Sequence, residues 1–412
     1  MSLSTRARWL RIAIVVWVAI LLAIGIRVAV ASRNNSVFPI FAAAGAHWRA
    51  GEPVYSAPTP ELDQFRYSPL VAAWFSLWSL LPRFAGEGIW RILNALVLLG
   101  SIVAWTRWRR SPSVLGWMLL LVVPLGVGGL NNGQCNALIA GLLLFAQVWL
   151  ERKLFWTAAA AVAVCVLLKE YPIALGLLFC LIEPRQFAPR FAICILAGLA
   201  LPYLMAPPQY VTEQYFAWFT RVSEDDRTSY ALGVSYRDLQ MLLRVYGLPL
   251  TLVQYRILES LLAVAAAGLV LSNRGRWPRE HAIAACGAMA ACWMTLAGPA
   301  TESSTLVLVA PLLAEMVLDA RDRLGWRRWL PIVSWVLLTV GAMIVWFPRV
   351  IAQPVHSTAI QPLGLVLLTV AAILAYRTPP SGSAPDRSDN GFQSWPRSQP
   401  PWRLAASESS RK

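Results

Sequence analysis

Long apolar blocks recur along all 412 residues of this chain, and they constrain its fold more than any other feature. A hydrocarbon layer about 30 Å thick needs about 20 apolar residues in a helix to cross it. The blocks come close to that length, and they lack the alternation of apolar and polar residues that marks the strands of a membrane barrel. The sequence therefore predicts an all-α, polytopic transmembrane helical bundle.

The composition excludes several other classes of protein. Only 14% of the residues are charged, against about 25% in an ordinary soluble domain. In a soluble protein the net charge of +15 would indicate nucleic acid, but no run of five like charges occurs. Cytoplasmic loops of membrane proteins collect Arg and Lys, so we expect no nucleic-acid partner. The six cysteines lie in or beside apolar runs without metal-ligand spacing, and we expect no metal site.

The apolar blocks predict twelve membrane spans. The first, about residues 12–31, follows three arginines and shows no small-residue cleavage site, so we interpret it as a retained signal anchor with a cytoplasmic N-terminus. The other candidate spans cover about residues 86–106, 114–130, 134–150, 154–168, 171–183, 189–206, 254–272, 281–299, 303–318, 329–347 and 361–376.

Basic residues support this order of spans. Lys and Arg concentrate in cytoplasmic loops, and in this chain five groups of them occupy alternate loops, all on the side of the N-terminus, while the opposite short loops are nearly uncharged. The basic loops contain Arg107, Arg109 and Arg110; Arg152 and Lys153; Arg185 and Arg190; Arg274, Arg276 and Arg279; and Arg321, Arg323, Arg327 and Arg328.

One apolar block does not fit the alternation. Residues 68–81 are only 14 in number, which gives a helix of about 21 Å. We favour a re-entrant or interfacial helix here, and an arrangement with thirteen spans is the alternative. The predicted transmembrane domain covers residues 1–376, with long outer loops at about 32–83 and 207–253. Residues 377–412 are rich in Ser, Pro and Arg and predict a disordered cytoplasmic tail.

Polar residues that stand beside apolar blocks are functional candidates, because charged groups at membrane depth are costly. Asp63, Arg66 and Tyr67 close the first outer loop, where an aromatic interfacial anchor with a surface ion pair is the alternative interpretation. Gln134 and Asn136 follow a turn and enter the next apolar block. Helix caps on a hairpin are the alternative for these two amides.

Three further sites complete the set of candidates. Lys169 and Glu170 interrupt two apolar blocks, and a compact ammonium suits phosphate, although an internal ion pair would also explain them. Glu302 stands at a helix entrance, where a carboxylate is also favoured as a cap. Arg237 precedes an amphipathic stretch and faces either an anion or a lipid headgroup. We find no soluble nucleotide-binding motif and expect no cofactor.

These motifs, in this order, resemble glycosyltransferase family 87, a set of C-type membrane glycosyltransferases. The resemblance extends over roughly residues 38–311, with later segments at 233–247 and 298–311. The motifs that carry it are Phe65-Arg66-Tyr67-Ser68-Pro69, Asn132-Gly133-Gln134-Cys135-Asn136 and Lys169-Glu170-Tyr171-Pro172.

The resemblance implies transfer of a sugar, often mannose, from a polyprenyl-phosphate donor on the non-cytoplasmic face, with a carboxylate of the first outer loop as base. The family often has an Asp just after the first helix, but this chain reads Asn34-Asn35-Ser36-Val37-Phe38-Pro39 there. We therefore expect Asp63 to be the base. The alternatives are Glu302, Glu170 or a chain that is not catalytic.

The sequence thus predicts a hexosyltransferase of the cell membrane, with both termini cytoplasmic and the site on the outer face. Its partners would be a polyprenyl-phosphate-sugar donor, a lipid or glycan acceptor and membrane lipids. A transporter or flippase for lipid-linked sugars or small solutes is the alternative class. The expected catalytic residues are Asp63 and Glu302, and the expected substrate-binding residues are Arg66, Tyr67, Gln134, Asn136, Lys169, Glu170 and Arg237.

Overall fold

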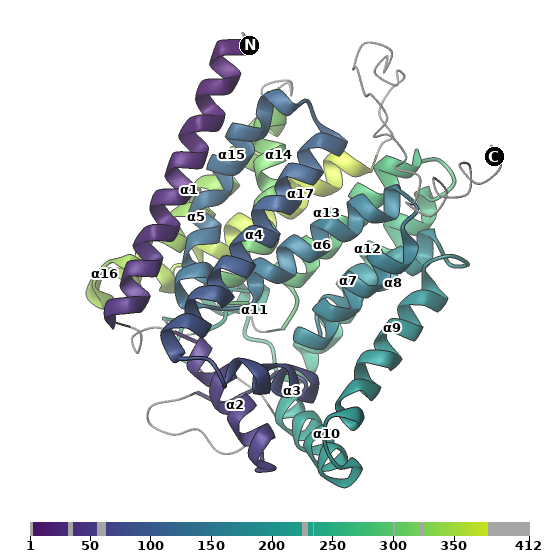
Figure 1. The fold of residues 1–412 in the computed structure, drawn as a ribbon. Coiled ribbons are helices and arrows are strands. Elements are labelled where there is room, and N and C mark those ends of the chain that lie inside the picture. Colours follow the sequence, from purple (N-terminus) through teal and green to yellow (C-terminus); the bar gives the residue numbers. More distant parts are fainter. Residues whose placement is uncertain are drawn as a thin grey trace, which may run out of the picture. The chain divides into compact units, whose positions relative to one another are not determined.

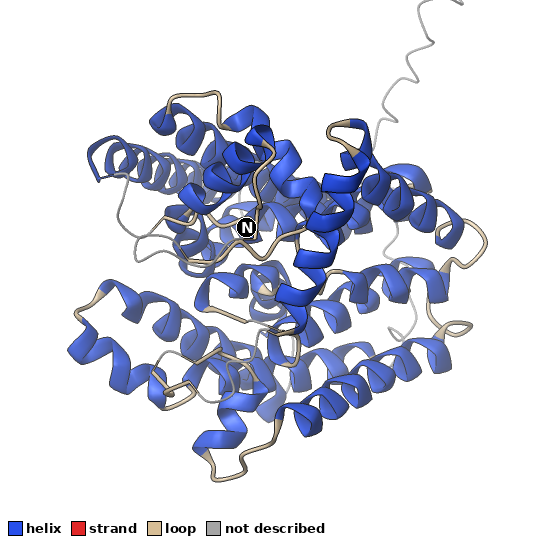
Figure 2. Ribbon diagram, turned by 90° about the horizontal axis from the view of Figure 1, so that it is seen from below, coloured by secondary structure: helices blue, strands red, loops and turns tan. Residues whose placement is uncertain are grey.

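The computed structural model describes residues 3–31, 36–55, 63–224, 230–233, 235–299, 301–320 and 325–377. Within these ranges every regular element is a helix (Figure 2), which confirms the all-helical prediction. Residues Met1–Arg377 form one compact unit. The tail predicted for 377–412 lies, from residue 378 on, outside the described residues.

Each predicted apolar span forms a helix at close to its expected place. Where a helix differs from its predicted span, it begins or ends a few residues before or after the predicted bounds. The helices that match the predicted spans are α1 (Leu3–Ala31), α4 (Arg83–Arg109), α5 (Leu115–Asn132), α6 (Asn136–Glu151), α7 (Phe155–Leu168), α8 (Ile173–Ile182), α9 (Ala188–Ala200), α12 (Leu252–Asn273), α13 (Arg279–Leu296), α14 (Ala310–Asp319), α15 (Trp329–Met343) and α17 (Ile360–Tyr376).

Five further helices lie outside the predicted spans: α2 (Phe38–Ala50), α3 (Pro69–Trp78), α10 (Pro208–Ser223), α11 (Leu239–Val245) and α16 (Arg349–Ser357). By length and composition, five helices of the described chain are suited to cross a membrane, or six if the bent pair α16 and α17 forms one span. Several of the remaining helices are apolar but shorter. The number of twelve spans therefore stays a prediction.

The helix ends that carry the basic residues gather at one end of the bundle, which we call the basic end. Arg109 at the end of α4 contacts Glu280 at the start of α13 (Nη1 to Oε1, 3.4 Å) and Glu315 near the end of α14 (Nη2 to Oε1, 3.3 Å). Arg279 pairs with Glu151 at the end of α6 (3.5 Å). The predicted basic loops beside these helices therefore share one end.

The start of α1 also lies at the basic end, because the Trp9 ring lies 4.1 Å from the Trp117 ring at the start of α5. The other end of α1 meets the opposite helix ends. There Arg27 of α1 and Arg91 of α4 both donate to the carbonyl oxygen of Asn131 at the end of α5 (2.5 and 3.2 Å). We call this opposite end the site end.

Residues 68–81 stay at the site end, as the sequence predicts. The end of α1 and the start of α4 both lie there, beside the end of α5. Figure 1 shows α2 and α3 together with α10 at the lower end of the bundle. Pro69 begins α3, and the Ser68 hydroxyl donates to the Leu167 carbonyl at the end of α7 (2.5 Å).

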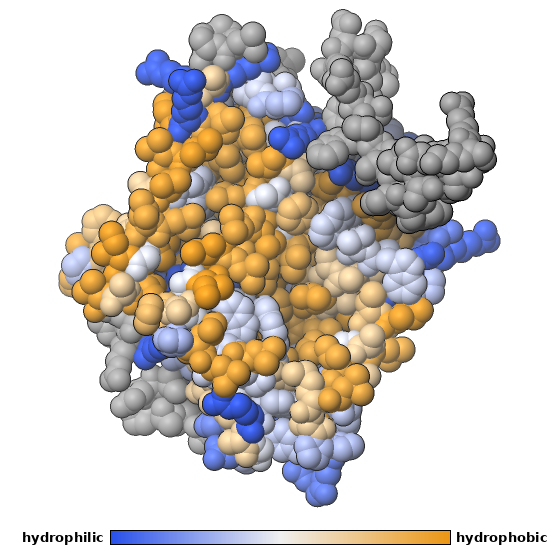
Figure 3. Space-filling model, viewed as in Figure 1, coloured by the Kyte–Doolittle hydropathy of each residue, from blue (hydrophilic) through white to orange (hydrophobic). Residues whose placement is uncertain are grey.

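The outer surface of the bundle is strongly apolar. Figure 3 shows hydrophobic side chains covering most of the middle, with hydrophilic residues gathered toward the two ends. On α12 only Tyr255 and Val270 are buried, while Val253 and Val264 are both 68% exposed. A helix that presents such residues outward is stable against hydrocarbon rather than water, which fits a multi-pass membrane protein.

Candidate active site

A tight turn between α5 and α6 positions the central side chains of the candidate site. Gly133 ends α5 with φ +72°, a left-handed conformation that glycine adopts without strain. Donors from other segments bind three successive carbonyls of the turn. Arg27 and Arg91 both donate to the carbonyl oxygen of Asn131. The Val37 N–H donates to the carbonyl oxygen of Asn132 at 2.8 Å, and Trp90 Nε1 donates to the carbonyl oxygen of Gly133 at 2.7 Å. The turn backbone is thereby fixed.

Four side chains then form a continuous network from a cation to a carboxylate. Lys169 Nζ donates to Asn136 Oδ1 at 2.9 Å. Asn136 Nδ2 donates to Gln134 Oε1 at 2.6 Å, and Gln134 Nε2 donates to Glu302 Oε2 at 2.7 Å. The structure thus brings together four of the predicted site residues, which come from the α5–α6 turn, the α7–α8 turn and the segment after α13. We call these four residues the amide network.

The neutral residues in the middle of the amide network are more buried than the charged residues at its ends. Asn136 is fully buried and Gln134 is 6% exposed, whereas Lys169 is half-buried and Glu302 is exposed. Buried amides need partners for their donors and acceptors, and the network supplies them. The two charges are held apart at its rim, where each remains available to a substrate.

Two hydroxyl side chains that the sequence analysis did not select complete the network. Ser304 Oγ donates to Gln134 Oε1 at 2.8 Å, and the Tyr171 hydroxyl donates to Asn136 Oδ1 at 3.3 Å. Tyr171 belongs to the Lys169-Glu170-Tyr171-Pro172 motif, so its position carried a signal. Ser304 lies in a run of ordinary polar residues and carried none.

Aromatic rings surround the Lys169 ammonium. Its Nζ lies 5.9 Å from the centre of the Tyr67 ring and 5.7 Å from that of Tyr171, distances typical of cation–π contacts. Burial raises the pKa of Tyr67 well above its ordinary value, with Cys135 and Glu302 nearby adding to the effect. The Tyr67 phenol therefore keeps its proton, and Tyr67 lies beside Lys169.

Asp63 and Arg66 form an ion pair, with 3.2 Å between Asp63 Oδ2 and Arg66 Nη1. The Asp63 side chain is 61% exposed, and Trp218 of α10 donates to the Arg66 carbonyl at 3.1 Å. This geometry is that of a surface ion pair, which the sequence analysis gave as the alternative interpretation of Asp63 and Arg66. Of the predicted carboxylates, Glu302 accepts a hydrogen bond directly from the buried amide of Gln134, while Glu170 is exposed beside Lys169.

Arg237 holds the second outer loop against the segment that carries Glu302. Its backbone N–H donates to the Thr301 carbonyl at 2.6 Å, and its guanidinium donates to the carbonyls of Leu232 and Gly233 at 3.1 and 2.9 Å. Burial lowers the pKa of Arg237 to about 10, and the charges of Glu302 and Asp238 oppose that shift. Arg237 therefore stays charged at neutral pH and bonds to loop backbone. Its contact with an anion stays a prediction.

A buried ion pair behind the turn is a further feature that the sequence analysis missed. Glu87 is fully buried and lies 3.1 Å from both Arg83 Nε and Arg91 Nη1. The three residues are spaced four apart at the start of α4, a spacing that places them on one helix face. That spacing was the available signal. Through Arg91 this ion pair supports the turn that carries Gln134.

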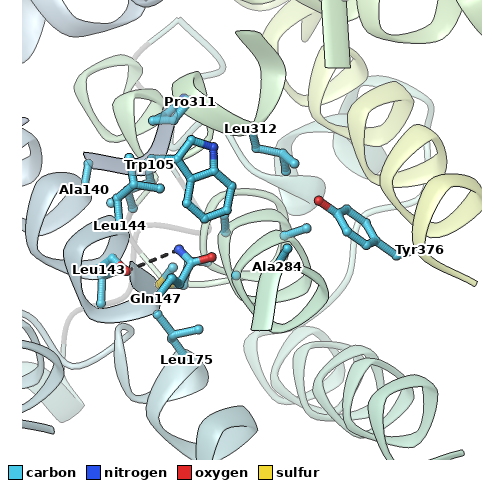
Figure 4. Close-up of a pocket in the computed structure, with 15 residues that line it drawn as sticks. Trp105, Ala140, Leu143, Leu144, Gln147, Leu175, Ala284, Pro311, Leu312 and Tyr376 are labelled. Carbon is cyan, nitrogen blue, oxygen red and sulfur yellow. Dashed lines mark hydrogen bonds between the residues drawn. The ribbon is translucent and has the colours of Figure 1, made fainter. Parts of the chain in front are cut away.

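Two cavities differ in their relation to the amide network. The smaller, of about 40 Å³, lies in the interior between Trp105, Gln147 and Tyr376, where Gln147 Nε2 donates to the Leu143 carbonyl at 3.2 Å (Figure 4). The larger, of about 360 Å³, lies at the site end and is lined in part by Glu302 and Ser304. Among the described residues, no three His, Cys, Asp or Glu side chains converge as they would around a metal ion.

Comparisons with known proteins place the chain in a family. No curated protein matches it. Among solved structures, it is similar to ArnT from Cupriavidus metallidurans bound to undecaprenyl phosphate, at 13% identity and a TM-score of 0.38, over 88% of this chain and 77% of that one. The model of glycosyltransferase family 87 matches residues 65–311, more than half of the chain. This membrane protein therefore belongs to glycosyltransferase family 87 and is a glycosyltransferase.

Proposed function

We propose that the protein transfers a hexose from a polyprenyl-phosphate donor to a lipid or glycan acceptor at the amide network. Mannose is the sugar that the resemblance of the motifs favours. The observation that carries the proposal is the arrangement of Lys169 and Glu302 at the two ends of one hydrogen-bonded chain of side chains. Glycosyl transfer needs a cation and a base at two separated points, and this arrangement supplies both.

In the proposed reaction, Glu302 accepts the proton of an acceptor hydroxyl. The acceptor oxygen then forms a bond to the anomeric carbon of the sugar, and the bond from that carbon to the phosphate oxygen breaks. The electron pair of the broken bond stays on the phosphate, where Lys169 stabilises the negative charge. A positioned base contributes about 10²–10⁴-fold, and preorganised stabilisation of the developing charge is often the larger effect.

The position of the Lys169 ammonium supports a lipid-linked phosphate as the donor. Lys169 stands at the site end of an apolar bundle, within the turn between α7 and α8. A phosphate attached to a polyprenyl chain would reach this depth with its chain in the hydrocarbon layer and its head among polar residues. A lipid-linked donor needs no soluble nucleotide-binding fold, and the sequence contains no motif for one.

The side of the membrane follows from charge. Cytoplasmic loops are enriched in Arg and Lys, and Arg109 and Arg279, which lie beside predicted basic loops, pair with acidic residues at the basic end. We therefore assign the basic end to the cytoplasm, with both termini on that side. The site end and the amide network then face outward, where the donor sugar would be presented.

We favour Glu302 over Asp63 as the base, because Glu302 bonds to Gln134 within the network that also binds Lys169. Asp63 is the second candidate, since it pairs with Arg66 close in sequence to Tyr67. A carboxylate that shares a network with the cation can be aligned with the leaving group. A surface ion pair offers no comparable alignment.

The test is to reconstitute the full chain in vesicles and supply a panel of radiolabelled polyprenyl-phosphate hexoses together with membrane glycolipids as acceptors. We expect one donor to be consumed and its label to appear in an extractable product, and Lys169→Met to abolish the transfer. If the wild-type protein consumes no donor of the panel, or if Lys169→Met transfers at the wild-type rate, the proposal is refuted.

A further inference from the structure

The larger cavity at the site end has two chemically different walls. One wall is polar and comes from Asn131, Asn132 and the segment Glu302–Ser304. The other is apolar and comes from Gly128 and neighbouring residues of α5, from Ala342 at the end of α15, and from Val345 and Trp346 of the short helix η6 (Ile344–Trp346) that follows α15. A volume of about 360 Å³ falls within the range of small-molecule sites. The cavity therefore suits a molecule with a polar part and an apolar part.

The amide network separates this cavity from the cation. Glu302 and Ser304 line the cavity, whereas Lys169 is not among its described lining residues. Asn136 and Gln134 lie between the two charges. Glu302 therefore presents its carboxylate at the cavity from one end of the network, while Lys169 stands at the other end.

Charge decides which substrate the cavity takes. Glu302 is the charged residue among its described lining residues, so a phosphate placed against Glu302 would meet a charge of the same sign. Hydroxyl groups would instead find the carboxylate, Ser303 and Ser304, and the two asparagines as hydrogen-bonding partners. The cavity thus favours a polyhydroxyl head group over the donor phosphate.

The surroundings of the cavity decide between a soluble and a membrane-bound acceptor. Trp346 is 51% exposed at the cavity and offers an aromatic face. On α15, which ends beside the cavity, Val340, Val336 and Val333 are 40–46% exposed and are spaced three and four residues apart, so they form an outward stripe on one helix face. An apolar tail would lie along this stripe in the hydrocarbon layer.

We infer that this cavity between the last turns of α5 and α15 is the acceptor site, and that the acceptor is a glycolipid. Its saccharide head lies against Trp346 with a hydroxyl on Glu302, and its tail follows the valine stripe of α15. This inference rests on the proposed function and adds the acceptor class and its route of entry from the membrane.

A glycine on the cavity wall allows a clean test. Gly128 lines the cavity, and a Cβ added there meets no atom within 4 Å, so Gly128→Leu places a larger side chain at the cavity wall without a clash at its Cβ. Gly268 on α12 also has no atom within 4 Å of an added Cβ, and it does not line the cavity. Gly268→Leu is therefore the matched control for a larger side chain on an apolar helix.

The first measurement is photolabelling, which does not depend on turnover. The probe is an octyl glucoside with a diazirine in its alkyl chain, and labelled peptides are mapped by mass spectrometry. We expect labels at the ends of α5 and α15 in the wild-type protein and in Gly268→Leu, and at least a tenfold loss in Gly128→Leu. Unlabelled octyl glucoside should compete, whereas a free oligosaccharide at the same concentration should not.

The second measurement is transfer to a glycolipid at varied donor and acceptor concentrations. We expect Gly128→Leu to raise the acceptor KM at least tenfold and to leave the donor KM within twofold of the wild-type value. Trp346→Ala should also raise the acceptor KM, whereas Trp346→Phe, which keeps an aromatic ring, should have an acceptor KM close to the wild-type value. Gly268→Leu should leave both KM values unchanged.

The outcomes separate the two proposals. If the wild-type protein consumes no donor, the proposed function fails, and the photolabelling pattern alone then decides whether the cavity is a glycolipid site. If transfer proceeds but Gly128→Leu changes neither the labelling nor the acceptor KM, the acceptor site lies elsewhere and this inference is overturned. Competition by the free oligosaccharide as strong as that by octyl glucoside would overturn the assignment of a membrane-bound acceptor.

Discussion

Replacing Asn136 by leucine removes the centre of the amide network while keeping the size of the side chain. In the wild-type protein Asn136 is fully buried. Its Oδ1 accepts from Lys169 and Tyr171, and its Nδ2 donates to Gln134 and Ser304. Leucine makes none of these hydrogen bonds, so the substitution disconnects the cation from the carboxylate without opening a large cavity.

The lengths of the four bonds give the size of the effect. The bond from the Lys169 ammonium is charge-assisted and contributes about 1.5–3 kcal/mol, and the short bond to Gln134 contributes about 1 kcal/mol. The two contacts at 3.3 Å contribute little. We therefore expect the free energy of unfolding to fall by about 3 kcal/mol. If the same contacts position Lys169 and Gln134 in the transition state, the rate falls about 100-fold.

Asn136→Asp separates the two halves of the network. Aspartate keeps an acceptor for Lys169 and Tyr171, but it has no N–H for Gln134 and adds a negative charge near Glu302. We expect a smaller loss of stability than in Asn136→Leu, together with a comparable loss of transfer.

The assay combines thermal unfolding of both variants in nanodiscs with single-turnover transfer from the radiolabelled donor. A lowered unfolding midpoint together with the 100-fold rate loss in Asn136→Leu would support the reasoning. Transfer by Asn136→Leu within threefold of the wild-type rate, together with unfolding at the wild-type temperature, would refute the central role of Asn136 in the network.

Three further predictions concern the supports of the site and the opposite end. Gly133→Ala forces a side chain into the left-handed region and brings its Cβ within 3.0 Å of Arg91 Nη2, so calorimetry should show a loss of about 1–2 kcal/mol. Burial raises the pKa of Asp238 from 3.8 to about 6, so the folded state binds the proton more tightly than the unfolded state, and stability falls as the pH rises across that range. Asp238→Asn should therefore flatten this part of the profile of unfolding temperature against pH. An unchanged profile would contradict the raised pKa of Asp238. Arg109→Leu removes the 3.3 Å contact to the buried Glu315 and leaves the longer contact to Arg110 at 3.9 Å, so chemical unfolding should show a loss of about 3 kcal/mol in the free energy of unfolding. The double variant Arg109→Leu with Glu315→Leu should recover most of that loss.

The helices and their order were predictable because apolarity and basic loops are local properties of the chain. The end of α4 and the start of α13 meet at Arg109 and Glu280 as the alternation of basic loops requires. By contrast, α10 and α16 were not predicted as helices. Polar residues interrupt the apolar positions of both helices, so neither shows the continuous apolar pattern that identified the spans.

The candidate site was predictable in part. Gln134, Asn136 and Lys169 were selected because polar groups beside apolar spans are costly, and the structure joins them. The relation of Glu302 to Gln134 was not predictable, because 168 residues separate the two side chains and only the packing of η3 (Ser303–Leu308) against α5 brings them together.

The preference for Asp63 as the base rested on its place in the first outer loop. That preference stays a prediction. The structure adds a physical reason for the alternative, because Glu302 accepts a hydrogen bond from a buried amide while Asp63 is paired with Arg66 at the surface. The sequence alone could not rank the two carboxylates, since each lies beside polar neighbours.

The most direct test of the account compares Glu302→Gln with Asp63→Asn in the reconstituted transfer assay. Glutamine keeps an oxygen that accepts from Gln134, so the network and the fold should persist while the base is lost. The account predicts that Glu302→Gln slows transfer about 10²–10⁴-fold, with an unchanged unfolding temperature, and that Asp63→Asn stays within tenfold of the wild-type rate. Transfer at the wild-type rate by Glu302→Gln, or its loss in Asp63→Asn alone, would contradict the account.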